Sequence, residues 1–172
     1  AVLNPLNTRL DAANVAFSLK HGAAKVLIVD GDYAPLVKRA LALLDRDITV
    51  IDIDAADGAS AALGAHNYEA LLAAADPAFR PPAIADEWQS LCLLYTSGTT
   101  GDPKGVVYSH RGAYLSALGN ALNVGLTFES KYLWTLPMFH CCGWSYPWAV
   151  VATGGTQICL RKVEPPVIFR LI

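Results

Sequence analysis

A glycine-rich stretch, residues 95–105, constrains this chain more than any other feature. It contains three glycines, four serine or threonine hydroxyls and one lysine, Lys104. An apolar run (91–95) precedes it and a β-branched run (106–108) follows it, so we expect a strand on each side. Glycine lets successive backbone N–H groups point into one concavity, hydroxyls add donors and a lysine adds positive charge. This inventory predicts a loop that binds a polyphosphate.

The alternative is a plain turn between two strands, because Thr-Gly and Gly-Asp-Pro are ordinary turn sequences. A hairpin turn needs only about two to five residues, and this stretch is roughly twice as long. A Walker loop is excluded, since Lys104 is followed by Gly105 and a strand-like run, not by Ser or Thr at the start of a helix. The physical reading therefore favours phosphate binding.

The stretch reads Tyr-Thr-Ser-Gly-Thr-Thr-Gly-Asp-Pro-Lys-Gly and resembles the signature phosphate loop of the adenylate-forming superfamily. Residues 1–7 are similar to that family's upstream strand, and residues 137–140 (Pro-Met-Phe-His) to its next downstream motif. The likeness covers nearly the whole chain. Phe-His followed by Cys-Cys-Gly-Trp resembles medium- and long-chain fatty acyl-CoA synthetases more than aryl-CoA ligases or peptide-synthetase domains. The resemblance implies a ligase that makes an acyl-adenylate and then acyl-CoA, with ATP, Mg²⁺ and coenzyme A.

Candidate site residues follow from both lines of reasoning. From their hydrogen-bond donors and charge, we predict that the following residues bind the ATP phosphates: Ser97, Gly98, Thr99, Thr100, Gly101 and Lys104. The resemblance implies that Thr96 helps to hold magnesium, that His140 lies where the acyl carboxylate meets ATP, and that Trp144 is an aromatic gate beside the acid. Without the resemblance, His140 is a packing histidine and Trp144 a core aromatic. A Cys–His nucleophile at Cys141 is disfavoured, because side chains adjacent in sequence rarely face each other.

The rest of the chain alternates helix and strand patterns, which predicts an α/β fold with mainly parallel, βα-repeating sheets. We expect helices at 11–20, 35–44, 68–75, 111–123 and 143–152, and strands at 25–29, 48–53, 105–108, 132–136 and 156–160. Asp11 and Ser109 are expected helix N-caps. The helix at 111–123 is expected to bury its large side chains: Tyr114, Leu115, Leu118 and Leu122. We divide the chain into a first sub-sheet (1–75), a proline-rich linker (76–89) and a second sub-sheet (90–172).

Composition limits the partners. A net charge of −2 without a basic run gives no electrostatic footprint for nucleic acid, and no apolar stretch approaches the roughly 20 residues of a membrane helix. The four cysteines have no zinc-ligand spacing, so we expect buried, reduced thiols in a cytoplasmic protein. Charged residues are only 16% against about 25% on average, which predicts self-association.

Both ends look cut, since no Met begins the chain and the last helix pattern has no cap. We expect a fragment of a ligase's N-terminal domain without the C-terminal domain, and inactive by itself. An aryl-CoA ligase is the nearest competitor. A non-catalytic nucleotide- or anion-binding module and a purely structural protein are the rivals from other classes.

Overall fold

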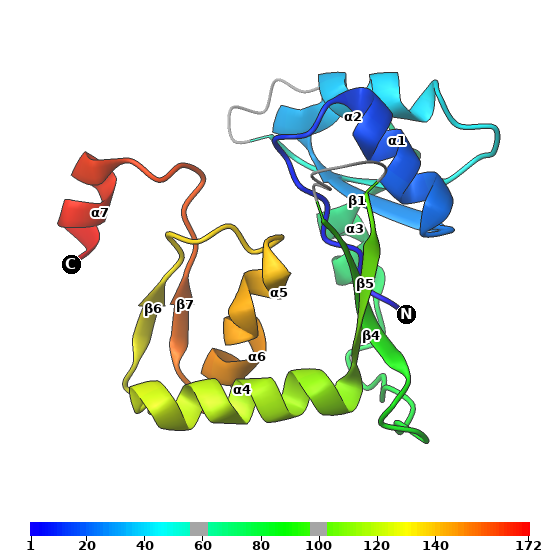
Figure 1. Cartoon of the computed structure of the whole chain (residues 1–172). Helices are drawn as coiled ribbons and strands as arrows, with labels where there is room; N and C mark the ends of the chain where they lie inside the picture. The colour runs from blue at the N-terminus through cyan, green and yellow to red at the C-terminus, as the bar shows by residue number, and fades with distance from the viewer. Residues whose placement is uncertain (56–61, 97–102) are drawn as a thin grey trace. The chain divides into compact units, whose positions relative to one another are not determined.

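The computed structural model describes residues 1–55, 62–96 and 103–172 (Figure 1). It is a mixed α/β structure, as the sequence predicted. Contacts divide it into two compact units, Leu6–Ala85 and a second unit formed by Ala1–Pro5 with Asp86–Ile172. The break falls inside the proline-rich segment 76–89, although the sub-sheet assignment itself stays a prediction. In the described part of the chain, no helix is long and apolar enough to cross a membrane.

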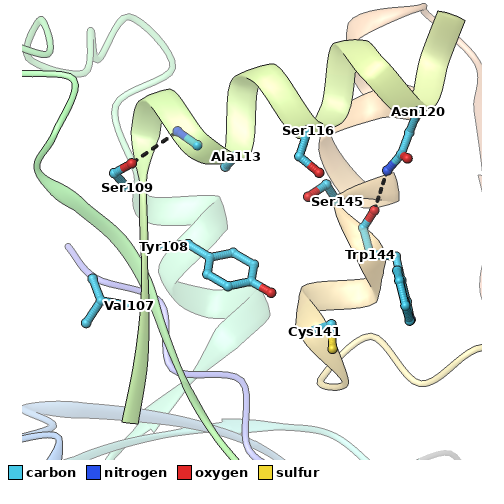
Figure 2. Close-up of a pocket in the computed structure, with 10 residues that line it drawn as sticks. Val107, Tyr108, Ser109, Ala113, Ser116, Asn120, Cys141, Trp144 and Ser145 are labelled. Atoms are coloured by element: carbon cyan, nitrogen blue, oxygen red, sulfur yellow. Dashed lines mark hydrogen bonds between the residues drawn. The ribbon is translucent and has the colours of Figure 1, made fainter.

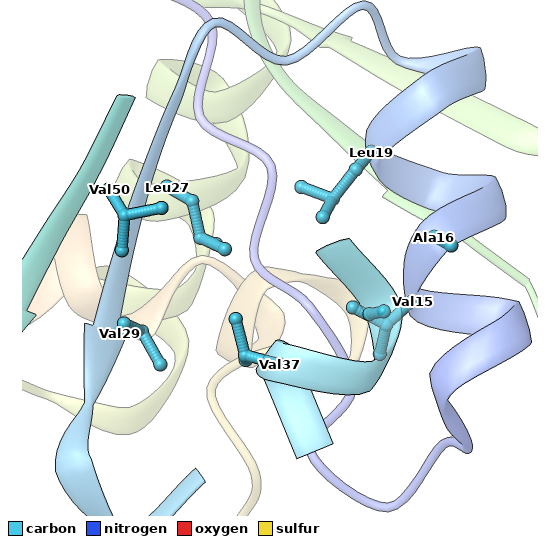
Figure 3. Packing of buried hydrophobic residues seen from close by; sticks show 8 residues of the cluster. Val15, Ala16, Leu19, Leu27, Val29, Val37 and Val50 are labelled. Carbon is cyan, nitrogen blue, oxygen red and sulfur yellow. The ribbon is translucent and has the colours of Figure 1, made fainter. Parts of the chain in front are cut away.

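The unit Leu6–Ala85 is built on a parallel sheet of order β1-β2-β3, made by β1 (Val26–Asp30), β2 (Thr49–Ile53) and β3 (His66–Asn67). Helices α1 (Ala12–His21) and α2 (Ala34–Leu41) flank the turn η1 (Gly31–Tyr33) and β1, and α3 (Tyr68–Ala74) follows β3. Apolar side chains from α1, α2, β1 and β2 interlock in one core, shown in Figure 3: Val15, Ala16, Leu19, Leu27, Val29, Val37, Ala40 and Val50. Asp11 caps α1 as predicted, accepting a hydrogen bond from the Asn14 N–H at 2.9 Å.

The second unit begins with a hairpin of β4 (Ser90–Tyr95) and β5 (Gly105–Ser109). The pair is antiparallel, with Leu93 opposite Val107, because the direct connection through the glycine-rich stretch needs no crossover helix. The N-terminal segment adds to the other side of β4: the Leu3 N–H donates to the Leu91 carbonyl at 3.0 Å, and the Leu3 carbonyl accepts from Leu93 at 2.8 Å. The second sheet, β6 (Lys131–Leu133) with β7 (Thr156–Ile158), is parallel.

Helix α4 (His110–Val124) connects the hairpin to the β6–β7 sheet. Its predicted N-cap is present: the Ser109 hydroxyl accepts from the Gly112 N–H at 3.1 Å. At the other end Gly125, with φ of 66°, ends the helix. The predicted buried face is wrong, since Tyr114, Leu115, Leu118 and Leu122 are all exposed. The buried side chains are small: Ala113, Ala117 and Ala121. Ala117 and Ala121 pack against Ala149, so α4 approaches its neighbour closely through alanines.

Three helices complete this unit: α5 (Cys141–Trp144), α6 (Tyr146–Ala152) and α7 (Pro165–Leu171). The single helix expected over 143–152 is wrong in its first part, because Cys141, Cys142, Gly143, Trp144 and Ser145 all have positive φ, between 44° and 65°. These five residues form a left-handed turn, and the right-handed helix α6 starts only at Tyr146, with Pro147 in its first turn. We call residues 141–145 the left-handed turn.

Candidate functional site

The glycine-rich stretch is closed at its base by the ends of β4 and β5. The Thr96 N–H donates to the Lys104 carbonyl at 3.0 Å, and Tyr95 lies opposite Gly105 in the ladder. Thr96 and Lys104 are both exposed. The predicted phosphate ligands Ser97, Gly98, Thr99, Thr100 and Gly101 lie outside the described residues, so their role stays a prediction.

The left-handed turn follows Pro137–His140, the second stretch that the sequence singled out. A left-handed conformation costs roughly 1–2 kcal/mol for each residue other than glycine, so surrounding contacts must hold this turn in place. The Gly143 N–H donates to the His140 carbonyl at 2.8 Å, and the Ser145 N–H to the Cys142 carbonyl at 3.2 Å. From helix α4, the Asn120 side-chain amide donates to the Trp144 carbonyl at 2.5 Å. Helix α4 therefore fixes the backbone that carries Trp144.

The left-handed backbone brings two adjacent side chains together. Cys141 Sγ lies 3.2 Å from His140 Nδ1, so the expectation that these neighbours do not face each other is wrong. In the tautomer with its proton on Nε2, the ring accepts the thiol proton at Nδ1. His140 itself is exposed and Cys141 is half-buried. The structure thus contains the Cys–His contact that ordinary backbone geometry argued against.

The next thiol along the chain points into the protein. Cys142 Sγ lies 3.3 Å from Cys92 Sγ on β4, and both residues are buried. Burial raises the pKa of the Cys92 thiol, and burial together with the Cys92 contact raises the pKa of Cys142 to about 12. Both groups are therefore protonated and unreactive at neutral pH. The expectation of buried thiols holds for this pair but not for Cys159, which is exposed.

A pocket of about 450 Å³ lies between β5, α4 and the left-handed turn (Figure 2). Its wall is formed by Val107, Tyr108, Ser109, Gly112, Ala113, Ser116, Asn120, Cys141, Trp144 and Ser145. Trp144 is 58% exposed, so it forms an open rim of the pocket and is not a core residue. His140 is not part of the wall, although it contacts Cys141, which is. The structure therefore places Trp144 on the pocket and His140 next to it.

The pocket also contains polar groups that the sequence reasoning missed. Ser145 is only 3% exposed and brings a hydroxyl to the pocket wall. The Tyr108 side chain extends into the pocket in Figure 2, and burial raises the pKa of its hydroxyl. Gly112, Ser116 and Asn120 recur every fourth residue, which places them on one face of α4. This four-residue spacing of small and polar residues is the sequence pattern from which the α4 side of the pocket could have been predicted.

Comparisons with known proteins agree on one family. A family model described as AMP-binding enzyme matches residues 1–172. The peroxisomal acetate/butyrate–CoA ligase AAE7 of Arabidopsis thaliana is 45% identical over the whole chain, which covers 32% of that protein. A putative long-chain-fatty-acid CoA ligase from Rhodopseudomonas palustris superposes with a TM-score of 0.82 at 25% identity, over 99% of this chain and 41% of that one. The o-succinylbenzoate CoA synthetase of Bacillus subtilis, in complex with ATP and magnesium ion, gives 0.74 at 26% identity, over 98% and 31%. The chain thus spans about a third of the length of the curated relative.

Proposed function

The chain belongs to the AMP-binding enzyme family, and from that premise we propose that the full-length protein carrying it is an AMP-forming acid–CoA ligase. The observation that carries the proposal is the course of strand β5. It starts at Gly105, where the glycine-rich stretch ends, and its last three residues, Val107 to Ser109, line the pocket. At about 3.3 Å per residue, the end of the predicted phosphate loop lies roughly 10 Å along the strand from Tyr108. A nucleotide on the loop and an acid in the pocket are then within reach of each other.

The reaction we propose joins a carboxylate oxygen to the α-phosphorus of ATP and expels pyrophosphate. Negative charge grows on the leaving group, so the chain's main contribution is a set of fixed donors around it. Lys104 and the backbone and hydroxyl groups of residues 97–101 supply those donors. Lys104 is exposed at the loop end, which suits a mobile ammonium that closes on phosphate. The acyl group then passes to the thiol of coenzyme A.

The donor chemistry at the base of the loop also fits a magnesium–nucleotide complex. Thr96 is exposed at the first position after β4 and offers a hydroxyl oxygen, the kind of hard ligand that magnesium prefers. Magnesium supplies neutralisation of phosphate charge when bound. Thr96 would hold it, together with groups from elsewhere in the full-length protein.

For the acid we propose an aliphatic, fatty-acid-type substrate that enters past Trp144. The likeness to the acetate/butyrate and long-chain ligases supports this choice. His140 orients or neutralises the carboxylate at the pocket edge, where it contacts Cys141. An aryl acid is the second candidate, favoured by the aromatic Tyr108 and Trp144 on the wall and by the likeness to the o-succinylbenzoate enzyme.

Pyrophosphate release by the full-length protein, with ATP and one acid at a time, tests the proposal. We expect butyrate, octanoate or palmitate to exceed benzoate, whereas the opposite order would favour the aryl alternative. Lys104→Ala should slow release by about a hundredfold or more, as loss of one charge-stabilising donor typically does. Lys131→Ala, which removes another exposed lysine on β6, is the matched control and should leave the rate unchanged. ATP binding without turnover of any acid would favour a non-catalytic nucleotide-binding module.

We further propose that the 172-residue chain is inactive without the rest of the ligase, and that the protein is cytoplasmic. Pyrophosphate release by the isolated chain would refute the first proposal. Fractionation of cells expressing the tagged full-length protein tests the second, and recovery in peroxisomes, the location of the Arabidopsis relative, would overturn it.

A further inference from the structure

The four cysteines occupy three different environments, and among the contacts that the structure describes only Cys141 combines access with a proton acceptor. Cys92 and Cys142 are buried against each other, and Cys159 is exposed. Cys141 is half-buried, forms part of the pocket wall and has His140 Nδ1 at 3.2 Å from its sulfur. A small molecule entering the pocket therefore meets a thiol that already has a base beside it.

The geometry around Cys141 is imposed by the protein. Residues on both sides of it are held, His140 by the Gly143 N–H to its carbonyl and Trp144 by the Asn120 amide. Cys141 itself has φ of 48°, a conformation that a residue other than glycine adopts only under constraint. The backbone that carries Cys141 and His140 is therefore held in one conformation, and this conformation places the two side chains in contact.

The pocket next to the Cys141 thiol has hydroxyl groups on its wall that can bind a polar ligand. Ser145, which is only 3% exposed, lies on the same wall, so a ligand in the pocket would meet its hydroxyl. The Tyr108 hydroxyl extends toward the same space in Figure 2. Among the described residues that form the wall there is no lysine, arginine, aspartate or glutamate, so none of them places a fixed charge next to a reagent.

We propose that Cys141 is a modification site for small-molecule disulfides, with His140 as the base that accepts its proton. Cys141 Sγ attacks one sulfur of the reagent, and the reagent's S–S bond breaks. A new S–S bond joins Cys141 to one half, and the other half leaves as a thiolate, while the thiol proton passes to His140 Nδ1. The disulfide reagent is the oxidant, and one thiol equivalent is released per modified chain. The attached half remains at the pocket wall, where it excludes another ligand.

Labelling of the folded chain with 2,2′-dithiodipyridine near pH 7 tests this inference. The released thiopyridone gives the rate, and tandem mass spectrometry of the peptides assigns each modified cysteine. We expect Cys141 to react first and faster than Cys159, with Cys92 and Cys142 reacting only in urea. In urea all four thiols should react at similar rates. Modification of Cys159 alone in the folded chain would overturn the proposal.

The variant His140→Gln separates assistance by the histidine from mere exposure of the thiol. It should slow Cys141 about a hundredfold, the lower end of the range for removal of a positioned base, and leave Cys159 unchanged. His66→Gln, which replaces a histidine of the other unit, is the matched control and should change neither rate. An unchanged Cys141 rate in the His140 variant would contradict the role of His140. The Cys159 rate and the protection of Cys92 report in the same experiment whether the variant is folded.

Discussion

Replacing Gly143 by alanine tests the left-handed turn on which the candidate site depends. Gly143 has φ of 56° and ψ of 31°, and alanine in this region costs roughly 1–2 kcal/mol. A Cβ at this position would also lie 2.7 Å from two ring carbons of Trp134, which is buried. The ring is held by its own hydrogen bond, from Nε1 to the Gln157 side-chain oxygen at 2.9 Å, so it has little freedom to move. Overpacking of this kind costs roughly 1–3 kcal/mol, and the two contributions together predict a loss of about 2–5 kcal/mol.

Gly119→Ala on helix α4 is the matched control. Gly119 lies in the helix interior, and in the described part of the chain a Cβ built there would meet nothing within 4 Å beyond the backbone of its own helix. Alanine should therefore stabilise the protein by roughly 0.5–1 kcal/mol, because it removes the conformational freedom of glycine from the unfolded chain. The same substitution is thus expected to have opposite signs at two positions of the same unit.

Urea unfolding followed by tryptophan fluorescence measures both effects. All four tryptophans lie after residue 85, so the signal reports on the second unit. With a slope of about 1 kcal/mol per molar urea, Gly143→Ala should lower the midpoint by about 2 M or more, and Gly119→Ala should raise it by less than about 1 M. A Gly143 variant as stable as the wild type would refute a left-handed turn packed on Trp134, and with it the Cys141–His140 geometry.

Three further predictions concern the same unit. Ser109→Ala should lower its stability by about 1 kcal/mol, measured by urea unfolding, because the Gly112 N–H loses its cap; Ser109→Asp keeps a cap and should lose less. Stability should fall as pH rises from about 9 toward 12, since the unfolded Cys142 thiol ionises near its ordinary pKa of 9.0 while the folded one keeps its proton to about 12. Cys142→Ala should flatten that slope, and an unchanged slope would contradict the burial argument. Leu122 is 83% exposed on the apolar face of α4, so the chain should self-associate, and Leu122→Lys should weaken this in sedimentation; a wild-type monomer at high concentration would contradict it.

Local signals predicted most helix boundaries. Asp11 and Ser109 cap α1 and α4 through bonds to the third following N–H, the geometry their short polar side chains favour. Gly22 and Gly125 mark the helix ends. These features involve a few consecutive residues, so the sequence contains all the information they need.

The buried face of α4 could not be found in the same way. Its leucines gave the stronger hydrophobic pattern, but the helix packs on α6 through Ala117 and Ala121 against Ala149. Which face is buried depends on how close the partner helix comes, and that distance is set by residues about thirty positions away in the sequence. Gly112, Ser116 and Asn120 form the row next to these alanines and line the pocket, so the wall of the site was missed together with the packing beside it.

The contact between His140 and Cys141 has a similar origin in tertiary structure. Within the left-handed turn only Gly143 favours positive φ, so local propensity predicts a right-handed helix through this stretch. Three constraints act against that preference: the Trp134 ring leaves no room for a side chain at 143, the Asn120 amide holds the Trp144 carbonyl, and the Cys142 thiol is buried on Cys92. Together they offset the strain of four residues other than glycine. The left-handed backbone at residues 141–145 lies beside the pocket and turns the Cys141 thiol and the His140 imidazole toward each other. An unstrained right-handed helix would not provide this geometry.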